Sequence, residues 1–201
     1  MAEQNKIRMS IQQIKVISEY KRELLNIQKN IEFFMELNTD LIKLSNGWLT
    51  IKFDNWHLDL VNKAEREGSG IIKQLDLLKE EYLLIYNKDF KIVIDRQINQ
   101  FHKIQSTYQQ LKKIEENNLK LKDEILFLTH SMNSLNTLLT PILKSIEQET
   151  SMKQHLFSTL FKKEITYTKA LNLLTNNIHL PNIELEAITD FNEIIKLEVK
   201  A

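Results

Sequence analysis

The feature that most constrains the fold is a scarcity of helix-breaking residues, because only three glycines and two prolines occur in 201 residues. Gly and Pro end most regular elements, so a chain with few of them has few turns and long elements. Between them, Leu, Ile, Phe and Met recur every three or four positions, the period of an amphipathic helix. The sequence therefore predicts an all-α protein, an elongated antiparallel helical bundle or coiled coil of three to four long helices.

We expect one elongated helical domain over residues 1–201. Its helices are expected at about residues 5–46, 71–140, 142–177 and 184–198. The first helix carries a heptad seam, in which spacings of three and four alternate. The members of this seam are Ile17, Tyr20, Leu24, Ile27, Ile31, Phe34, Asn38 and Leu41. Asn38 is its polar member, and a polar seam residue costs stability but can fix the register of packed helices.

A second seam runs from Phe101 to Leu139, so the helix over 71–140 is expected to continue without a break. Thr140-Pro141 should end or kink it, because proline lacks a backbone donor and clashes with the preceding turn. Thr as N-cap with Pro in the first helical position also suits the start of the next helix. One neighbouring helix would leave part of the second seam exposed, and we therefore expect a homo-oligomer.

Residues 48–61 depart from the helical pattern. Ser45-Asn46-Gly47 is typical of a helix end, and apolar and polar residues alternate on both sides of Asp54-Asn55. With Asp54-Asn55 as a turn, the segment becomes a β-hairpin with one apolar face. That face carries Leu49, Ile51, Phe53, Trp56, Leu58 and Leu60. An extended segment followed by a helix, and an unbroken helix, are alternatives that the sequence leaves open.

The expected partner-binding residues are Trp48 and these six apolar residues. A two-stranded hairpin alone is only marginally stable in water, so its apolar face must pack on the chain's own helices or on another molecule. Aromatic residues are enriched in the hot spots of interfaces, which favours a protein partner. The alternative is that Trp48 and Trp56 attach the end of the bundle to its own core.

The composition argues against several classes of function. Cysteine is absent, which excludes disulfides, thiol catalysis and thiolate metal sites. The five histidines are scattered and lack the His or Glu spacing of zinc and di-iron helices. No Gly-x-Ser-x-Gly motif occurs. We therefore predict no catalytic, cofactor-binding or metal-binding residues, and a protein that is not an enzyme.

Charge and hydropathy bear on the partners and the location. The 27 basic and 27 acidic residues balance, whereas binding to nucleic acid needs an unbalanced basic face. No apolar run approaches the ~18 residues of a spanning helix, and the polar N-terminal residues do not resemble a signal peptide. We expect a cytoplasmic protein with protein partners and no nucleic acid, while a membrane as partner and leaderless secretion stay open.

Two families resemble parts of the chain. A long helix, an apolar segment beginning at Gly47-Trp48-Leu49-Thr50-Ile51 and a second long helix are similar in outline to prefoldin subunits, over residues 10–110. That resemblance implies a chaperone that holds unfolded clients. A Trp between two helices resembles the WXG family of small secreted helical hairpins, but Trp48-Leu49-Thr50 lacks its glycine. We assign the chain to neither family.

The expected function is a non-catalytic scaffold, adaptor or holding chaperone that works through coiled-coil contacts in a larger bacterial or phage assembly. The alternative is a leaderless secreted or membrane-acting helical protein that uses the apolar residues of segment 48–61.

Overall fold

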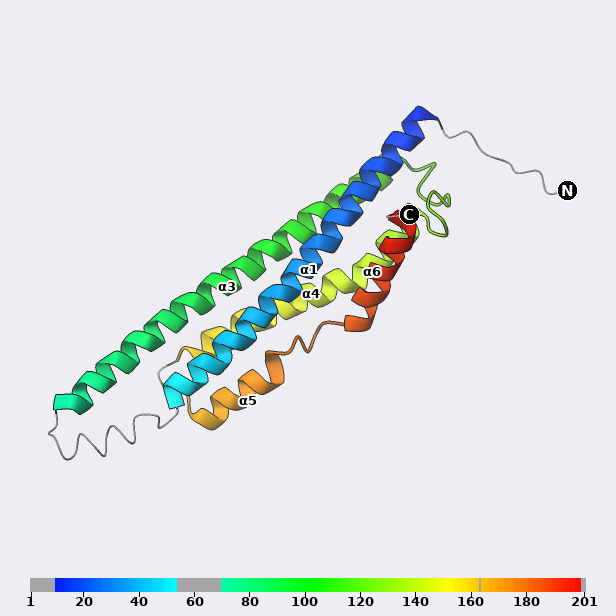
Figure 1. Cartoon of the computed structure of the whole chain (residues 1–201). Coiled ribbons are helices and arrows are strands. Elements are labelled where there is room, and N and C mark those ends of the chain that lie inside the picture. The colour runs from blue at the N-terminus through cyan, green and yellow to red at the C-terminus, as the bar shows by residue number, and fades with distance from the viewer. Residues whose placement is uncertain (1–9, 54–69, 163, 200–201) are drawn as a thin grey trace. The chain divides into compact units, whose positions relative to one another are not determined.

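The computed structural model describes residues 10–53, 70–162 and 164–199 and is all-helical there, with no strand (Figure 1). Its elements are α1 (Ile11–Phe53), α3 (Gly70–Asn117), α4 (Met132–Leu160), α5 (Tyr167–Asn177) and α6 (Leu185–Val199). The predicted all-α class is confirmed. These five described helices replace the three to four expected, because the long apolar patterns are interrupted at two places described below.

Contacts divide the chain into two compact units. The first unit comprises Met1–Glu32, Phe101–Ile146 and Glu184–Ala201, and the second comprises Phe33–Gln100 and Glu147–Ile183. Helices α1, α3 and α4 each contribute to both units, whereas α5 belongs to the second and α6 to the first. Each unit has its own buried residues.

The buried face of α1 follows the predicted heptad seam. All eight seam residues from Ile17 to Leu41 are at most 9% exposed, including Asn38 at 4%. The same spacing of three and four continues through Ser45 and Trp48, which are also buried. A helix with one continuous apolar stripe gains its stability by packing that stripe, and α1 does so over most of its length.

The two ends of α1 differ from the expected bounds of 5–46. Ser10 and Gln13 cap each other at the N-terminus: the Ser10 N–H donates to Gln13 Oε1 at 2.8 Å, and the Gln13 N–H donates to Ser10 Oγ at 3.2 Å. This reciprocal capping box explains the start at Ile11. At the other end the helix runs through Gly47 to Phe53.

The predicted β-hairpin over 48–61 is therefore wrong for residues 48–53, which are helical, and the rest of it lies outside the described residues. The apolar stripe of α1 continues to Trp48, so packing extends the helix past the expected stop. Gly47 does not end the helix, and its lack of a side chain leaves space for a neighbouring residue. A Cβ atom there would collide with the Tyr86 ring and hydroxyl, so the missing side chain leaves room for this side chain of α3.

The predicted helix over 71–140 is also wrong, because α3 ends at Asn117. Turns follow, in which the N–H groups of Asn118, Leu121 and Glu124 each bond to the carbonyl three residues earlier. The Asn118 side chain donates to the Ile114 carbonyl at 2.7 Å, which satisfies a carbonyl at the helix end. The second seam thus breaks, and Ile125 and Leu128 are each 67% exposed.

Helix α4 begins at Met132 and contains Pro141 in its interior, so the expected boundary at Thr140-Pro141 is wrong. Ser131 and Ser134 cap its start reciprocally, since the N–H of each donates to the hydroxyl oxygen of the other at 2.9 and 3.1 Å. Leu139 and Ile142 flank the proline and are buried at 0% and 1% exposure. Packing on both sides of Pro141 compensates for the backbone hydrogen bond that proline removes.

The expected helix over 142–177 is divided, because α4 ends at Leu160 and α5 starts after the N-cap Thr166. The Thr166 hydroxyl oxygen accepts a hydrogen bond from the Lys169 N–H at 3.4 Å. Between α5 and α6, Leu180 has a φ of 56°, a left-handed conformation that is uncommon for a residue other than glycine. Helix α6 lies within one residue of its expected bounds.

Replacing Pro141 with Ala tests the position of this proline. Inside a helix, Ala should raise the free energy of unfolding by about 1 kcal/mol or more, because it restores a donor and is the better helix former. Urea unfolding of the purified Pro141→Ala variant measures the change. An unchanged or lower stability would instead fit a proline at the first position of a helix, where it is favourable.

Candidate functional site

The structure brings together some of the residues expected to bind a partner. Trp48 is 1% exposed and belongs to the core of the second unit, and Leu49 and Phe53 are partly buried against the same core. Leu49 and Phe53 are four residues apart and share a helix face, whereas Ile51 points to a different side and is partly buried. Trp56, Leu58 and Leu60 lie outside the described residues.

An aromatic cluster of Trp48, Phe53 and Tyr167 lies at the end of α1. The Trp48 and Phe53 ring centroids are 5.9 Å apart at 79°, and those of Phe53 and Tyr167 are 5.2 Å apart at 70°. Both pairs have the edge-to-face geometry that favours aromatic contacts. Tyr167 is 48% exposed, Phe53 is partly buried and Trp48 is buried, so the cluster extends from the core to the surface.

Lys52 and Asn87 complete the cluster. The Lys52 ammonium lies 4.6 Å from the Trp48 ring centroid and 5.6 Å from that of Phe53, within the range of cation–π attraction. Burial lowers the pKa of Lys52 below its ordinary value. The Trp48 indole N–H donates to Asn87 Oδ1 at 3.2 Å, which satisfies its polar atom and fixes its position against α3.

Sequence reasoning found two members of this site, Trp48 and Phe53, and missed Tyr167, Lys52 and Asn87. Tyr167 comes from the first turn of α5, more than a hundred residues after Phe53. No periodicity connects residues so far apart, and only the packing of the second unit brings them together. The sequence contained a weak indication that Lys52 belongs to this site, since Lys52 is next to Phe53 and four residues after Trp48 on one helix.

A buried ionic cluster in the second unit surrounds Lys153. This side chain is 1% exposed, donates to the Ile178 carbonyl at 2.8 Å and to Asn38 Oδ1, and pairs with Glu149 Oε1 at 3.2 Å. An ammonium group has three N–H bonds, and here it makes two hydrogen bonds and one ion pair. Lys153 therefore has no donor left for a substrate and links α1, α4 and the segment after α5.

The other members of the Lys153 cluster also make internal contacts, and Glu149 Oε1 is buried with the ion pair to Lys153 and without a hydrogen bond. Glu149 Oε2 accepts hydrogen bonds from the Asn182 backbone N–H at 3.1 Å and from its side-chain amide at 3.0 Å. The Asn38 amide donates to the Ile178 carbonyl at 3.0 Å. The polar seam residue identified in the sequence thus bonds to a backbone atom 140 residues away. Burial lowers the pKa of Lys153 to about 8, and the Glu149 charge partly opposes this shift.

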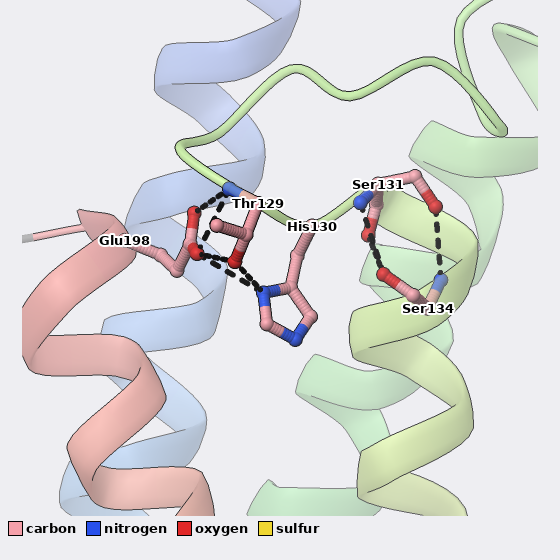
Figure 2. Close-up of polar contacts among 5 residues, drawn as sticks. All are labelled: Thr129, His130, Ser131, Ser134 and Glu198. Carbon is pink, nitrogen blue, oxygen red and sulfur yellow. Dashed lines mark hydrogen bonds and ion pairs between the residues drawn. The ribbon is translucent and has the colours of Figure 1, made fainter.

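A second polar cluster, in the first unit, joins α6 to the segment before α4 (Figure 2). Glu198 is 5% exposed and accepts hydrogen bonds from the Thr129 N–H at 3.0 and 3.1 Å, from the Thr129 hydroxyl, and from His130 Nδ1 at 3.0 Å. Burial disfavours the Glu198 charge, but the hydrogen bonds from Thr129, His130 and the Leu128 backbone outweigh it. They lower the pKa of Glu198 to about 2.

This Glu198 cluster contains a hydroxyl, an imidazole and a carboxylate, but it does not have the geometry of a catalytic triad. In a triad the carboxylate binds one ring nitrogen and the hydroxyl binds the other. Here the Thr129 hydroxyl and Glu198 both contact His130 Nδ1, at 2.8 and 3.0 Å, and Nε2 is turned away from both (Figure 2). The Thr129 hydroxyl donates its hydrogen bond to Glu198. The arrangement anchors α6 and leaves no activated nucleophile.

A metal site and a membrane-spanning helix each have requirements that can be compared with the described part of the chain. Among those residues, no group of three or more His, Asp or Glu side chains is placed to hold a metal ion. In the same ranges, no helix is both long enough and apolar enough to cross a bilayer. The aromatic cluster is the candidate functional surface, since its rings extend from the core to the surface and the two polar clusters are directed at internal partners.

The pKa of Lys153 predicts how stability depends on alkaline pH. Its folded value of about 8 lies below the ordinary 10.5, so between these values the unfolded chain holds a proton that the folded chain has released. The Lys153 contribution to stability should therefore improve as pH rises through this window. Urea unfolding from pH 7 to pH ~9.5 should show the wild type gaining relative to a Lys153→Met/Glu149→Gln variant. Parallel curves for the two proteins would contradict this.

The Glu198 cluster predicts the opposite behaviour in acid. Its folded pKa of about 2 lies below the ordinary 4.5, so its stabilisation is complete above pH 4.5 and is lost as pH falls toward 2. At neutral pH, Glu198→Gln should lower the free energy of unfolding by about 1–2 kcal/mol, because it loses charge-assisted hydrogen bonds. The difference from wild type should shrink in acid. Chemical unfolding at several pH values measures it, and a pH-independent difference would refute the assignment.

Comparison with known proteins gives no relative from which a function could be transferred. No family model matches the chain, and neither curated protein sequences nor solved structures show significant similarity to it. The function is therefore inferred from the geometry of the aromatic cluster and from the surfaces of the helices.

Proposed function

We propose that this protein is a non-catalytic helical scaffold or adaptor that works through protein–protein contacts. Its role would be that of an assembly component or a holding chaperone, in the cytoplasm. The observation that carries the proposal is the aromatic cluster, in which the buried Trp48 supports the partly covered rings of Phe53 and Tyr167. Such a surface is suited to docking a protein and offers no reactive group.

The physical argument for a protein partner is preorganisation. Edge-to-face packing and the Trp48–Asn87 hydrogen bond hold the rings in place, so binding costs little side-chain entropy. Tyr and Trp are enriched in interface hot spots because they contribute large apolar area together with a polar atom. Lys52 adds a positive charge beside the rings, which favours a partner with an acidic residue next to an apolar one.

The polar clusters support the non-catalytic part of the proposal. The Lys153 ammonium makes two internal hydrogen bonds and one ion pair, and Glu198 accepts hydrogen bonds from the hydroxyl and imidazole groups that surround it. Groups that satisfy each other in this way stabilise the fold and are not available to a substrate. The membrane-acting alternative depends mainly on Trp56, Leu58 and Leu60, which lie outside the described residues, and no described contact favours it.

A co-purification experiment with charge-inserting variants tests the proposal. Tagged Tyr167→Asp should lose the proteins that co-purify with wild type from cells of the native host, because the carboxylate places charge within the docking surface. Its thermal unfolding should stay close to wild type, since Tyr167 is half-exposed. Mass spectrometry of the captured proteins gives the readout.

Leu185→Asp is the matched control, because Leu185 is 55% exposed and lies on α6 in the first unit. This variant should retain the partners. If Tyr167→Asp, and a second variant Lys52→Glu, both capture the wild-type set of proteins, the aromatic cluster is not the docking surface and the proposal fails.

A further inference from the structure

A continuous apolar face of α3 lies exposed in the second unit. It is referred to below as the α3 face and consists of Leu77, Leu78, Tyr82, Leu84, Ile85 and Ile92, each between 40% and 70% exposed. The other side of the same helix is in the core, where Phe90, Val93 and Ile94 are buried. Helix α3 is therefore apolar on two sides here, and the described residues of the unit bury only one of them.

Two opposite charges lie along the α3 face. Glu81 and Lys88 are exposed and seven residues apart, so they project from the same side of the helix two turns from each other. Their positions on the helix fall between Leu77 and Leu84 on one side and Ile85 and Ile92 on the other. In the described part of the chain neither has an ion-pair partner.

The apolar and charged residues of the α3 face match the same residues of a second copy of the helix that runs in the opposite direction. A two-fold axis between Leu84 and Ile85 would align a second, antiparallel copy of the helix so that each residue meets its mirror position. Glu81 then lies opposite Lys88 of the second copy, Leu84 lies beside the axis close to Leu84 of the second copy, and Leu77 lies at the same level along the helix as Ile92 of the second copy. A parallel alignment in register would instead place Glu81 opposite Glu81 and Lys88 opposite Lys88, which is repulsive.

We infer that the α3 face binds a second copy of this chain, as an antiparallel two-fold pair centred between Leu84 and Ile85. A two-fold interface uses the same patch on both copies, and the α3 face meets that requirement in both apolar and charged positions. Standard interfaces bury about 800 Å² per partner, and six large half-exposed side chains with their charged neighbours supply much of that area. The inference rests on the proposed function and names one of its partners.

The mass of the untagged full chain should rise from monomer toward dimer with concentration, as measured by sedimentation equilibrium. Leu84→Asp should weaken the dimer at least about tenfold, because two carboxylates would meet near the axis. Circular dichroism should show unchanged helicity, since Leu84 is 70% exposed. Leu197→Asp, at a residue that is 65% exposed on α6 of the first unit, is the control and should dimerise as wild type does.

Charge exchange tests the antiparallel alignment. Glu81→Lys places Lys opposite Lys, and Lys88→Glu places Glu opposite Glu, so each variant alone should dimerise more weakly than wild type. An equimolar mixture of the two variants should recover the dimer, because each Lys then meets a Glu. The double variant Glu81→Lys/Lys88→Glu should also dimerise like wild type.

A wild-type protein that stays monomeric up to millimolar concentration overturns the inference. A dimer that is insensitive to Leu84→Asp, or single charge variants whose mixture dimerises no better than either alone, overturns it as well. The proposed function is tested separately, since Leu84→Asp should still co-purify with the partners that Tyr167→Asp loses. Failure of dimerisation with retained partner capture would reject the α3 pair and leave the aromatic docking surface in place.

Discussion

The need to cover one continuous stripe on α1 constrains the rest of this structure. The stripe begins at Ile17 and extends to Trp48, and its residues are buried along this length. Because α1 runs through both compact units, other helices must supply apolar residues to it in each. In the second unit, residues of α3, α4 and α5 meet Leu37, Leu41 and Trp48 in one hydrophobic cluster. Hydrophobic burial of this kind is strong, but it does not by itself select one register.

Buried polar contacts select the register that apolar packing leaves undetermined. In the second unit, Lys153 and Asn38 both bond to the carbonyl of Ile178, which fixes α1 and α4 against the segment that follows α5. In the first unit, Glu198 and Thr129 fix α6 against the segment before α4. A shift of one residue would leave these groups buried without partners, at a cost of several kcal/mol. Each unit therefore contains a directional contact in addition to its core.

The need to remove apolar side chains from water also explains the two proposed binding surfaces. Phe53 and Tyr167 at the end of α1 retain partly exposed rings, and α3 exposes a second apolar side between Leu77 and Ile92. Exposed apolar residues that occur singly are ordinary, whereas contiguous ones mark interaction sites. We propose the aromatic cluster as a small docking point and the α3 face as a longer, self-complementary one. A scaffold needs at least two such surfaces to connect two molecules.

The sequence by itself determined the all-α class and the buried positions of α1, because a period of 3.6 residues is a local property of the chain. The sequence also contains Ser10-x-x-Gln13 and Ser131-x-x-Ser134, whose residues form short-range hydrogen bonds that cap the starts of α1 and α4. Tertiary structure decided where α3 ends, that α4 continues through Pro141, and that Tyr167 meets Phe53. These outcomes depend on packing between residues far apart in the chain. Helical periodicity predicts which residues are buried, but the residues that pack on them are known only from the tertiary structure.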